Sequence, residues 1–470
     1  MNHSMYDFGM IGLGVMGRNF LLNVADHDYA ALGLDLDQDK VDALNQEAEG
    51  RRIGGTTSMK DFVAQLKIPR KIMLLVPAGK PVDSVIGQLL KHVDKGDLII
   101  DGGNSHFDDT NRRVTDLANK GIHFLGVGVS GGAEGARRGP SIMPGGNQEA
   151  YSLVAPILEA VSAKVNGEPC VDYMGQNSAG HYVKMVHNGI EYGMMQLIAE
   201  VYDILKRIAK LHNDQIGEIF DDWNQKELRS FLIEITAVIF AQADEEGDGD
   251  LIDKILDKAK QKGTGKWTSQ SALDLGVPVP TIDAAVTMRG LSAQKVNRLK
   301  AAETYPDENF ELAGIDTNVL VKRLRETLYF SFVVTYAQGY AQLAEASKEF
   351  GYDLDMERIA RIWRGGCIIR ADILEFIRRA FKEEKEIPNL LLSEVFKAEI
   401  HRTHNSVRAI LKLSLDYGIP TLAISSTLHY FDALRAGRLP LNLVQAQRDY
   451  FGSHTYERID KGGVFHTDWK

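Results

Sequence analysis

Residues 8–17 read FGMIGLGVMG, and this stretch decides how the first part of the chain folds. The apolar run from Phe8 to Leu13 predicts a buried strand, after which three glycines open a helical pattern. Gly12 suits a tight turn, Gly14 lets a pyrophosphate approach the backbone, and Gly17 lets the helix pack closely on the strand. The helix N-terminus adds N–H groups and a partial positive charge. The motif predicts a dinucleotide site that comprises Gly12, Leu13, Gly14, Val15, Met16 and Gly17.

An acidic residue follows at the expected end of the second strand, in GLDLD. Asp35 lies 18 residues after Gly17, where a carboxylate can accept hydrogen bonds from both ribose hydroxyls of NAD. Asp35 and Asp37 would repel the extra phosphate of NADP, and Leu36 offers no guanidinium to bind it. Charge alone therefore predicts NAD.

Strand-like and helix-like segments alternate up to about residue 178. After the first strand, apolar runs predict further strands at Ala30–Leu34, Lys71–Val76, Asp97–Ile100 and Phe124–Val129. Such alternation is typical of a parallel sheet with helices on both faces. We expect an α/β Rossmann-type domain at residues 1–178.

Beyond Gly180 the sequence shows helical periodicity and almost no strand signal. Long helical segments are predicted at Ile190–Leu211, Glu227–Ala241, Thr317–Phe350 and Glu394–Tyr417. The units that begin QLIAEVYDIL and QLAEASKEFG resemble each other, which suggests an internal duplication. We expect a large all-α domain at 179–438 and an extended C-terminal tail at 439–470.

Composition excludes several classes of protein. The chain has 470 residues and a net charge of −10, which argues against broad nucleic-acid binding. Its two cysteines, Cys170 and Cys367, offer neither a disulfide framework nor metal-ligand spacing, so a reducing compartment, the cytoplasm, is expected. We see no signal peptide at the start, no apolar run long enough to span a bilayer, and no cluster that argues for a metal.

The stretch YVKMVHNGIEYG, residues 182–193, spaces polar groups by threes and fours. Lys184, His187, Asn188 and Glu191 would share one side of an α-helix, and apolar residues would occupy the other sides. A solvated polar stripe with a weak Lys–Glu pair explains this spacing as well as a functional site does. The rest of the chain has to decide between them.

Three further clusters are candidates for ligand binding. Asn104 in IDGGNS comes just after a strand, where open α/β sheets bind ligands. The glycines of GVSGGAEGARRGPSIMPGG, from Gly128, could hold an oxyanion with backbone N–H groups, although such segments are often mobile loops. Lys262 and Lys266 in KGTGKWTSQSALDLG would suit a phosphate, although surface lysines are the commoner explanation.

The chain resembles the 6-phosphogluconate dehydrogenase family along essentially its whole length from Gly12. The most specific motifs are VSGGAEGARRGPSIMPGG, GHYVKMVHNGIEYG, KGTGKWTSQSALDLG and QRDYFGSHTYERID, in the order that the family has them. The resemblance implies oxidation and decarboxylation of 6-phosphogluconate to ribulose 5-phosphate in the pentose phosphate pathway. It also implies an obligate homodimer in which each tail reaches the neighbouring subunit's site.

The resemblance further implies roles for single residues. Lys184 corresponds to the family's general base and Glu191 to its general acid. Groups around the carboxylate and hydroxyls of the substrate would be Asn104, Ser130, Gly131, Gly132, His187 and Asn188. Groups at its phosphate end would be Tyr192, Lys262, Arg289, Arg448 and His454. The cofactor would also contact Asn104 and the segment Val76, Pro77 and Ala78.

The cofactor half departs from the commoner family pattern. Most members have Asn-Arg-Ser or Asn-Arg-Thr in place of Asp35, Leu36 and Asp37, and that arginine binds the NADP phosphate. The departure agrees with the charge argument for NAD, with NADP left as the alternative. Cations that could overturn this expectation by reaching the ribose are Lys40, Arg51, Arg52 and Lys80.

Lys184 must have a depressed pKa to act as a base, because an ordinary lysine is protonated at neutral pH. Three other interpretations stay open. A non-decarboxylating 3-hydroxyacid dehydrogenase shares the fingerprint and the helical lysine but has little use for a phosphate clamp. A nucleotide-sugar dehydrogenase needs a nucleophilic cysteine in a suitable motif. A dinucleotide sensor without catalysis would not need an intact Lys–Glu helix.

Overall fold

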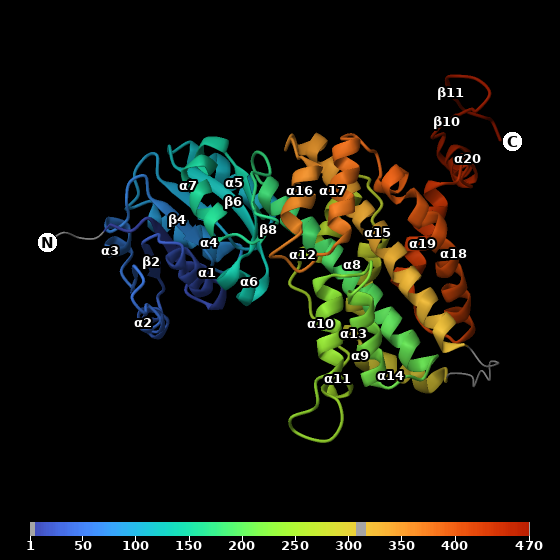
Figure 1. Cartoon of the computed structure of the whole chain (residues 1–470). Coiled ribbons are helices and arrows are strands. Elements are labelled where there is room, and N and C mark those ends of the chain that lie inside the picture. The colour runs from blue at the N-terminus through green and yellow to red at the C-terminus, as the bar shows by residue number, and fades with distance from the viewer. Residues whose placement is uncertain (1–4, 307–315, 470) are drawn as a thin grey trace.

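The computed structural model describes residues 5–306 and 316–469 and begins with a seven-stranded sheet (Figure 1). The strand order is β3-β2-β1-β4-β5-β6-β7, and the strands from β1 to β6 pair in parallel. β7 is antiparallel to β6. The strands are β1 (Phe8–Ile11), β2 (Ala31–Leu34), β3 (Ile53–Thr56), β4 (Lys71–Leu74), β5 (Leu98–Asp101), β6 (His123–Ser130) and β7 (Ser141–Gly146).

The sheet is built from apolar strands that helices bury on both sides. β1, β2 and β5 are buried at every position, as expected for central parallel strands. The helices of this domain are α1 (Val15–Asp26), α2 (Gln38–Gln46), α3 (Met59–Ala64), α4 (Lys80–Leu89), α5 (Phe107–Ala118), α6 (Gly132–Arg138) and α7 (Gln148–Val161). A short hairpin, β8 (Lys164–Val165) with β9 (Glu168–Pro169), follows α7.

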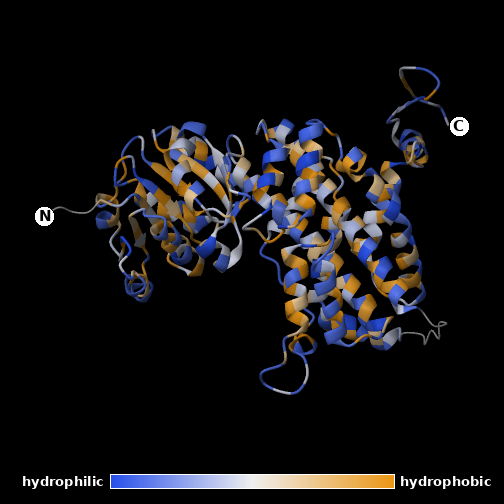
Figure 2. Ribbon diagram, viewed as in Figure 1, coloured by the Kyte–Doolittle hydropathy of each residue, from blue (hydrophilic) through white to orange (hydrophobic). Residues whose placement is uncertain are grey.

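A helical domain follows, and its core lies around two long helices. α8 (Ala179–Arg207) and α15 (Thr317–Phe350) pack against each other, and α18 (Glu394–Asp416) packs on α15. In Figure 2 hydrophobic residues follow the sheet and these central helices. The remaining helices are α9 (Asn213–Asn224), α10 (Phe231–Phe240), α11 (Leu251–Lys254), α12 (Thr264–Asp274), α13 (Pro280–Ala293), α14 (Lys295–Thr304), α16 (Met356–Trp363), α17 (Ile373–Glu383), the 3₁₀ turn η1 (Leu390–Leu392) and α19 (Leu422–Leu434).

This architecture confirms the predicted α/β domain followed by a large helical one, with three local corrections. β3 was not expected, because its sequence IGGT is rich in glycine, which is uncommon in strands. In the structure this strand is half-buried. The segment from Gly128 to Gly146 is not a loop, since it forms the end of β6, then α6, then β7. The tail is not wholly extended, because it contains α20 (Leu441–Gly452) before the hairpin of β10 (Tyr456–Glu457) and β11 (Val464–Phe465).

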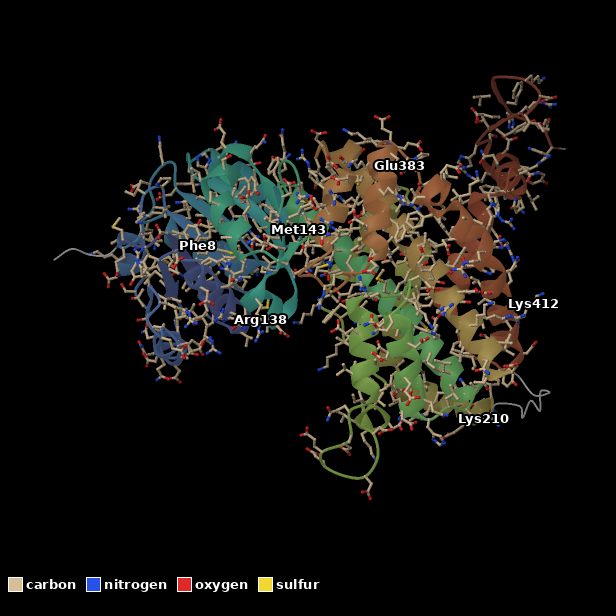
Figure 3. All side chains as sticks on the ribbon, viewed as in Figure 1. Phe8, Arg138, Met143, Lys210, Glu383 and Lys412 are labelled. Atoms are coloured by element: carbon tan, nitrogen blue, oxygen red, sulfur yellow. The ribbon has the colours of Figure 1, made fainter. Side chains whose placement is uncertain are left out.

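The residues predicted on α8 lie near the junction between the two domains, where α8 packs on β6 and β7. Figure 3 shows Met143 of β7 at this junction. A Cβ atom added to Gly180 would lie 2.2 Å from the carbonyl oxygen of Met143, so only glycine permits this approach. The first turns of α8 are therefore buried directly against the sheet. Among the helices that the structure describes, none combines the length and apolar character needed to cross a membrane.

Candidate active site

Lys184, His187 and Glu191 lie side by side on α8. Nζ of Lys184 is 3.4 Å from Nδ1 of His187, which is 3.9 Å from Oε2 of Glu191. Lys184 is 6% exposed, His187 is fully buried, and the side chain of Glu191 is 20% exposed. This burial argues against a solvated polar stripe.

Burial shifts the pKa values of these three residues in the directions that favour their uncharged forms. Burial lowers the pKa of Lys184, and the nearby Glu191 opposes that change only in part. Burial raises the pKa of Glu191, while Lys184 and Arg289 act in the opposite direction. The pKa of His187 falls well below its ordinary value because of burial and the adjacent Lys184. Burial therefore shifts the pKa values of Lys184 and Glu191 in the directions that favour the neutral amine and the neutral carboxylic acid.

The β6–α6 turn and α12 hold the middle of this group. The Ser130 hydroxyl lies 3.4 Å from Nε2 of His187, and Oδ1 of Asn188 lies 3.1 Å from its Nδ1. The Asn188 amide donates to the Thr264 hydroxyl at 3.0 Å. Gly131, with φ +116°, is the N-cap of α6, and Gly132 is its first residue. The structure thus brings the predicted residues Ser130, His187 and Asn188 together. Thr264, which lies inside the motif KGTGKW, was not among the predicted site residues.

Cations gather near the far end of the same helical face. The Arg289 guanidinium lies over the ring of Tyr192, 3.7 Å from its centroid, and donates to the Lys260 carbonyl at 2.7 Å. Lys262 is exposed and comes just before α12, whose Gly265 packs against Tyr192. Arg289 and the Lys262 turn therefore lie at the Tyr192 end of the site.

The tail residues do not join this group within one chain. In Figure 1, α20, which carries Arg448, lies at the far end of the helical domain from the sheet, and His454 follows it. The tail is organised around Asp449, whose carboxylate accepts from Thr455 N at 2.9 Å, His466 Nδ1 at 2.8 Å and Trp469 Nε1 at 2.8 Å. These hydrogen bonds lower the pKa of Asp449 to about 2. Sequence reasoning had not identified Asp449.

A cavity of about 320 Å³ lies at the carboxyl ends of β1, β2 and β4. Its walls include the predicted residues Gly12, Gly14, Asp35, Leu36, Val76 and Pro77. A Cβ on Gly17 would lie 1.9 Å from the Gly12 carbonyl oxygen, so the close packing expected of the motif is present. The remaining predicted residues, Leu13, Val15, Met16, Asp37, Ala78 and Asn104, belong to or border the loops after these strands and β5.

Asp35 is fixed by the loops on either side of it. Its carboxylate accepts from the backbone N–H of Leu13 at 2.8 Å and of Asp37 at 3.0 Å. Nζ of Lys40 lies 3.5 Å from Asp35 and 3.5 Å from Asp37. These backbone hydrogen bonds and Lys40 lower the pKa of Asp35 despite its partial burial. The cavity is therefore lined by an ionised Asp35.

The cations that could bind an extra phosphate are differently placed. Arg51 pairs with Asp26 at 2.5 Å and with Glu49 at 3.3 Å, whereas Lys40 lies at the cavity wall. Arg52 and Lys80 are exposed outside the lining. Across the part of the chain that the structure describes, no group of three or more His, Cys, Asp or Glu residues could hold a metal ion.

Comparison with known proteins agrees with this geometry. Residues 7–175 match the NAD binding domain of 6-phosphogluconate dehydrogenase, and residues 180–469 match the C-terminal domain of the same enzyme. The chain is 51% identical over 466 residues to the NADP(+)-dependent, decarboxylating 6-phosphogluconate dehydrogenase of Bacillus subtilis, covering 99% of both chains. It is 50% identical to decarboxylating 6-phosphogluconate dehydrogenase 2 of Saccharomyces cerevisiae, covering 99% of this chain and 95% of the yeast protein.

A solved structure agrees over the same length. Plasmodium falciparum 6-phosphogluconate dehydrogenase, determined without ligand, with its cofactor NADP+ and with its substrate 6-phosphogluconate, superposes with a TM-score of 0.96. The identity is 44%, and the match covers 98% of this chain and 100% of the Plasmodium chain. Both domains and the tail are therefore shared, and the chain belongs to the 6-phosphogluconate dehydrogenase family.

Proposed function

We propose that the protein oxidises and decarboxylates 6-phospho-D-gluconate to D-ribulose 5-phosphate and CO2, with reduction of a nicotinamide dinucleotide. The observation that carries the proposal is the buried row of Lys184, His187 and Glu191, in which an amine with a lowered pKa stands near a carboxyl group with a raised pKa. Family membership supports the substrate.

The proposed chemistry assigns one proton transfer to each end of that row. The neutral amine of Lys184 takes the proton of the hydroxyl on carbon 3, while the bound nicotinamide accepts the hydride from that carbon. The new ketone next to carbon 2 accepts electrons as the carbon 1–carbon 2 bond breaks and CO2 leaves, and protonated Lys184 polarises its oxygen. The protonated Glu191 then delivers a proton to the carbon that lost CO2. His187, Asn188 and Ser130 hold the hydroxyls and the developing enolate.

We propose that the other substrate-binding residues act as the family resemblance implies. Asn104, Gly131 and Gly132 would complete the site around the carboxylate. Tyr192, Lys262 and Arg289 would bind the phosphate, joined by Arg448 and His454 from the tail of a second subunit. The position of α20 at the far end of its own chain supports exchange of tails in a homodimer. The boundaries 1–178, 179–438 and 439–470 describe these three functional parts.

We propose that the coenzyme is NAD in preference to NADP, unlike the Bacillus relative. Asp35 is ionised, fixed by Leu13 N–H, and lines the cavity where an adenosine ribose would lie. The position of the family's phosphate-binding arginine is taken by Leu36, and Arg51 is paired with Asp26. The free buried thiols Cys170 and Cys367 fit a reducing compartment such as the cytoplasm.

The test is an assay of purified protein with 6-phosphogluconate and each coenzyme in turn, in which reduced nicotinamide and CO2 are both measured. We expect one CO2 for each reduced coenzyme, and a higher kcat/KM with NAD. Reduction without CO2 would instead indicate a 3-hydroxyacid dehydrogenase. Binding of NAD without any turnover of the sugar acid would reject an enzymatic role for this substrate.

A further inference from the structure

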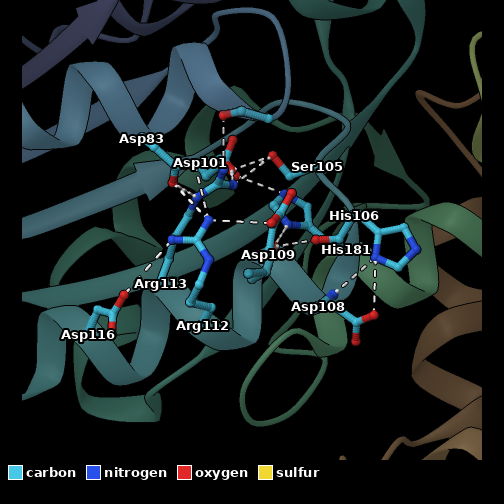
Figure 4. Close-up of polar contacts among 12 residues, drawn as sticks. Asp83, Asp101, Ser105, His106, Asp108, Asp109, Arg112, Arg113, Asp116 and His181 are labelled. Carbon is cyan, nitrogen blue, oxygen red and sulfur yellow. Dashed lines mark hydrogen bonds and ion pairs between the residues drawn. The ribbon is translucent and has the colours of Figure 1, made fainter.

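A buried ion pair lies beneath the loop that carries Asn104. Asp101, the last residue of β5, is fully buried, and Arg113 of α5 is 2% exposed. Nη1 of Arg113 lies 3.1 Å from Oδ2 of Asp101 (Figure 4). Neither residue was predicted to touch a ligand. Burying such a pair costs desolvation free energy, so its presence does not by itself indicate that it stabilises the fold.

The pair anchors the Asn104 loop on both sides of that residue. The Gly103 N–H donates to Oδ1 of Asp101 at 3.1 Å, and the Ser105 hydroxyl donates to Oδ2 at 2.6 Å. Arg113 also donates to the Ser105 hydroxyl at 3.2 Å. Asn104, between these two anchors, is exposed. The side chain that would meet both substrate and cofactor is therefore supported by fixed neighbours.

The same guanidinium reaches the second cofactor loop. Nη2 of Arg113 donates to the Gly79 carbonyl at 3.1 Å, directly after the segment 76–78, and Nε donates to Asp83 at 2.8 Å. The planar fork of arginine satisfies these acceptors in fixed directions, which a lysine ammonium cannot reproduce. Arg113 thus ties the β4–α4 loop to the β5–α5 loop.

The other side of Asp101 is tied to α8. Nε2 of His181 donates to the Asp101 carbonyl at 3.0 Å, and its Nδ1 lies 2.7 Å from the Thr110 hydroxyl. Burial lowers the pKa of His181, so the ring is neutral, and Nδ1 accepts from Thr110. His181 precedes Lys184 by three residues, which is about one helical turn.

We propose that Arg113 and Asp101 are positioning residues that set both cofactor loops at a fixed place relative to Lys184. The inference rests on the proposed function, because that function assigns ligand contacts to Asn104 and to the segment 76–78. A displacement of about 1 Å between reacting groups can lower a rate about 100-fold. The pair would therefore act on hydride transfer without touching substrate or cofactor.

The experiment compares Arg113→Lys with Arg112→Lys in the full-length protein. Arg112 is the preceding residue of the same helix and also pairs with Asp83, at 3.1 Å, but its side chain is half exposed and contacts neither loop. We expect Arg113→Lys to lower kcat about 10- to 100-fold, to enlarge the isotope effect with substrate deuterated at carbon 3, and to weaken NADH binding about 10-fold. Arg112→Lys should change each quantity less than about 2-fold.

An Arg113→Lys protein with wild-type kcat, isotope effect and NADH affinity, altered only in melting temperature, would overturn the proposal. NADH binding is measured without sugar acid, so it decides the positioning role even if the wild type does not oxidise 6-phosphogluconate. If Arg113→Lys does not fold, Ser105→Ala decides by the same measurements, because it keeps the ion pair and removes only one anchor of the loop. Wild-type binding and rate in that variant would equally reject the inference.

Discussion

Replacement of Asp35 by Asn should shift the coenzyme preference toward NADP. The carboxylate is held at the cavity wall by Leu13 N–H and Asp37 N–H, and its pKa is lowered, so it carries a full negative charge at neutral pH. A 2′-phosphate bound at the ribose would lie next to that charge. The substitution removes the charge and keeps the size of the side chain.

The size of the effect follows from Coulomb's law. Two unit charges about 4 Å apart interact by about 1 kcal/mol in water. A phosphate monoester carries a charge of roughly −2 at neutral pH, so its repulsion from Asp35 amounts to about 2 kcal/mol. Lys40, 3.5 Å from the carboxylate, offsets part of this repulsion in the wild type and is released to meet the phosphate in the variant. We expect the ratio of kcat/KM for NADP over NAD to rise about 30-fold.

The assay is that ratio at low and at moderate ionic strength. Asp42→Asn is the matched control. It changes the net charge of the protein by the same amount, but at an exposed residue of α2 that lies outside the cavity lining. The shift in Asp35→Asn should shrink as salt screens the charges. An unchanged ratio, or an equal shift in Asp42→Asn, would refute the electrostatic argument.

Four further predictions concern the catalytic helix and its surroundings. Lys184→Met should lower turnover about 1,000-fold or more while NAD binding persists, and stopped-flow hydride transfer at the wild-type rate would reject Lys184 as the base. Because the pKa of Glu191 is raised and the acid must be protonated, activity should fall as pH rises through that pKa, and the pH–rate profile of Glu191→Gln should lack this alkaline limb. Gly128→Ala should lower kcat about 100-fold in steady-state assays, since the added Cβ would lie 2.4 Å from Cβ of Lys184. Burial raises the pKa of Glu200 to about 7, so the folded state binds the Glu200 proton more tightly than the unfolded chain does. The free energy of unfolding should therefore fall by up to about 3 kcal/mol as pH rises from about 4 to about 7. Denaturant titrations of Glu200→Gln should show a free energy of unfolding that depends less on pH.

Local sequence patterns predicted the parts of the fold that rest on uninterrupted apolar runs. The strands β1, β2, β4, β5 and β6 fall within or beside the predicted ranges because their residues are apolar and buried. β7, with the sequence SIMPGG, contains proline and glycine, which argue against a strand. Gly145 is needed because α8 packs on it so closely that a Cβ atom would lie 2.2 Å from the backbone nitrogen of Gly180. That requirement arises from a helix more than thirty residues later and has no local signal.

The same limit applies to the site. Helical spacing placed Lys184, His187 and Glu191 together, because a contact between residues three or four apart depends on one helix alone. Thr264 and Arg113 make contacts across elements distant in sequence. Thr264 lies inside the motif KGTGKW, but no local pattern shows that it contacts Asn188, and no motif marks Arg113. The tail helix α20 was missed for a related reason. Its apolar residues, among them Leu441, Val444 and Phe451, are exposed, and its only buried side chain is Asp449, so no core within the chain marks this helix.

Under the proposed function, the opposed pKa shifts of Lys184 and Glu191 would also return the site to its starting state. In the proposed mechanism, one turnover would add a proton to the amine and remove one from the carboxyl group, which would leave Lys184⁺ and Glu191⁻. The attraction of these charges favours that form, whereas burial, the largest cause of both shifts, favours the neutral form. Because Lys184 is 6% exposed and the side chain of Glu191 is 20% exposed, transfer of one proton from Lys184 to Glu191 would relieve the desolvation of two charges. A site closer to solvent would lose this driving force, and the packing of α8 on β6 and β7 keeps Lys184 away from solvent.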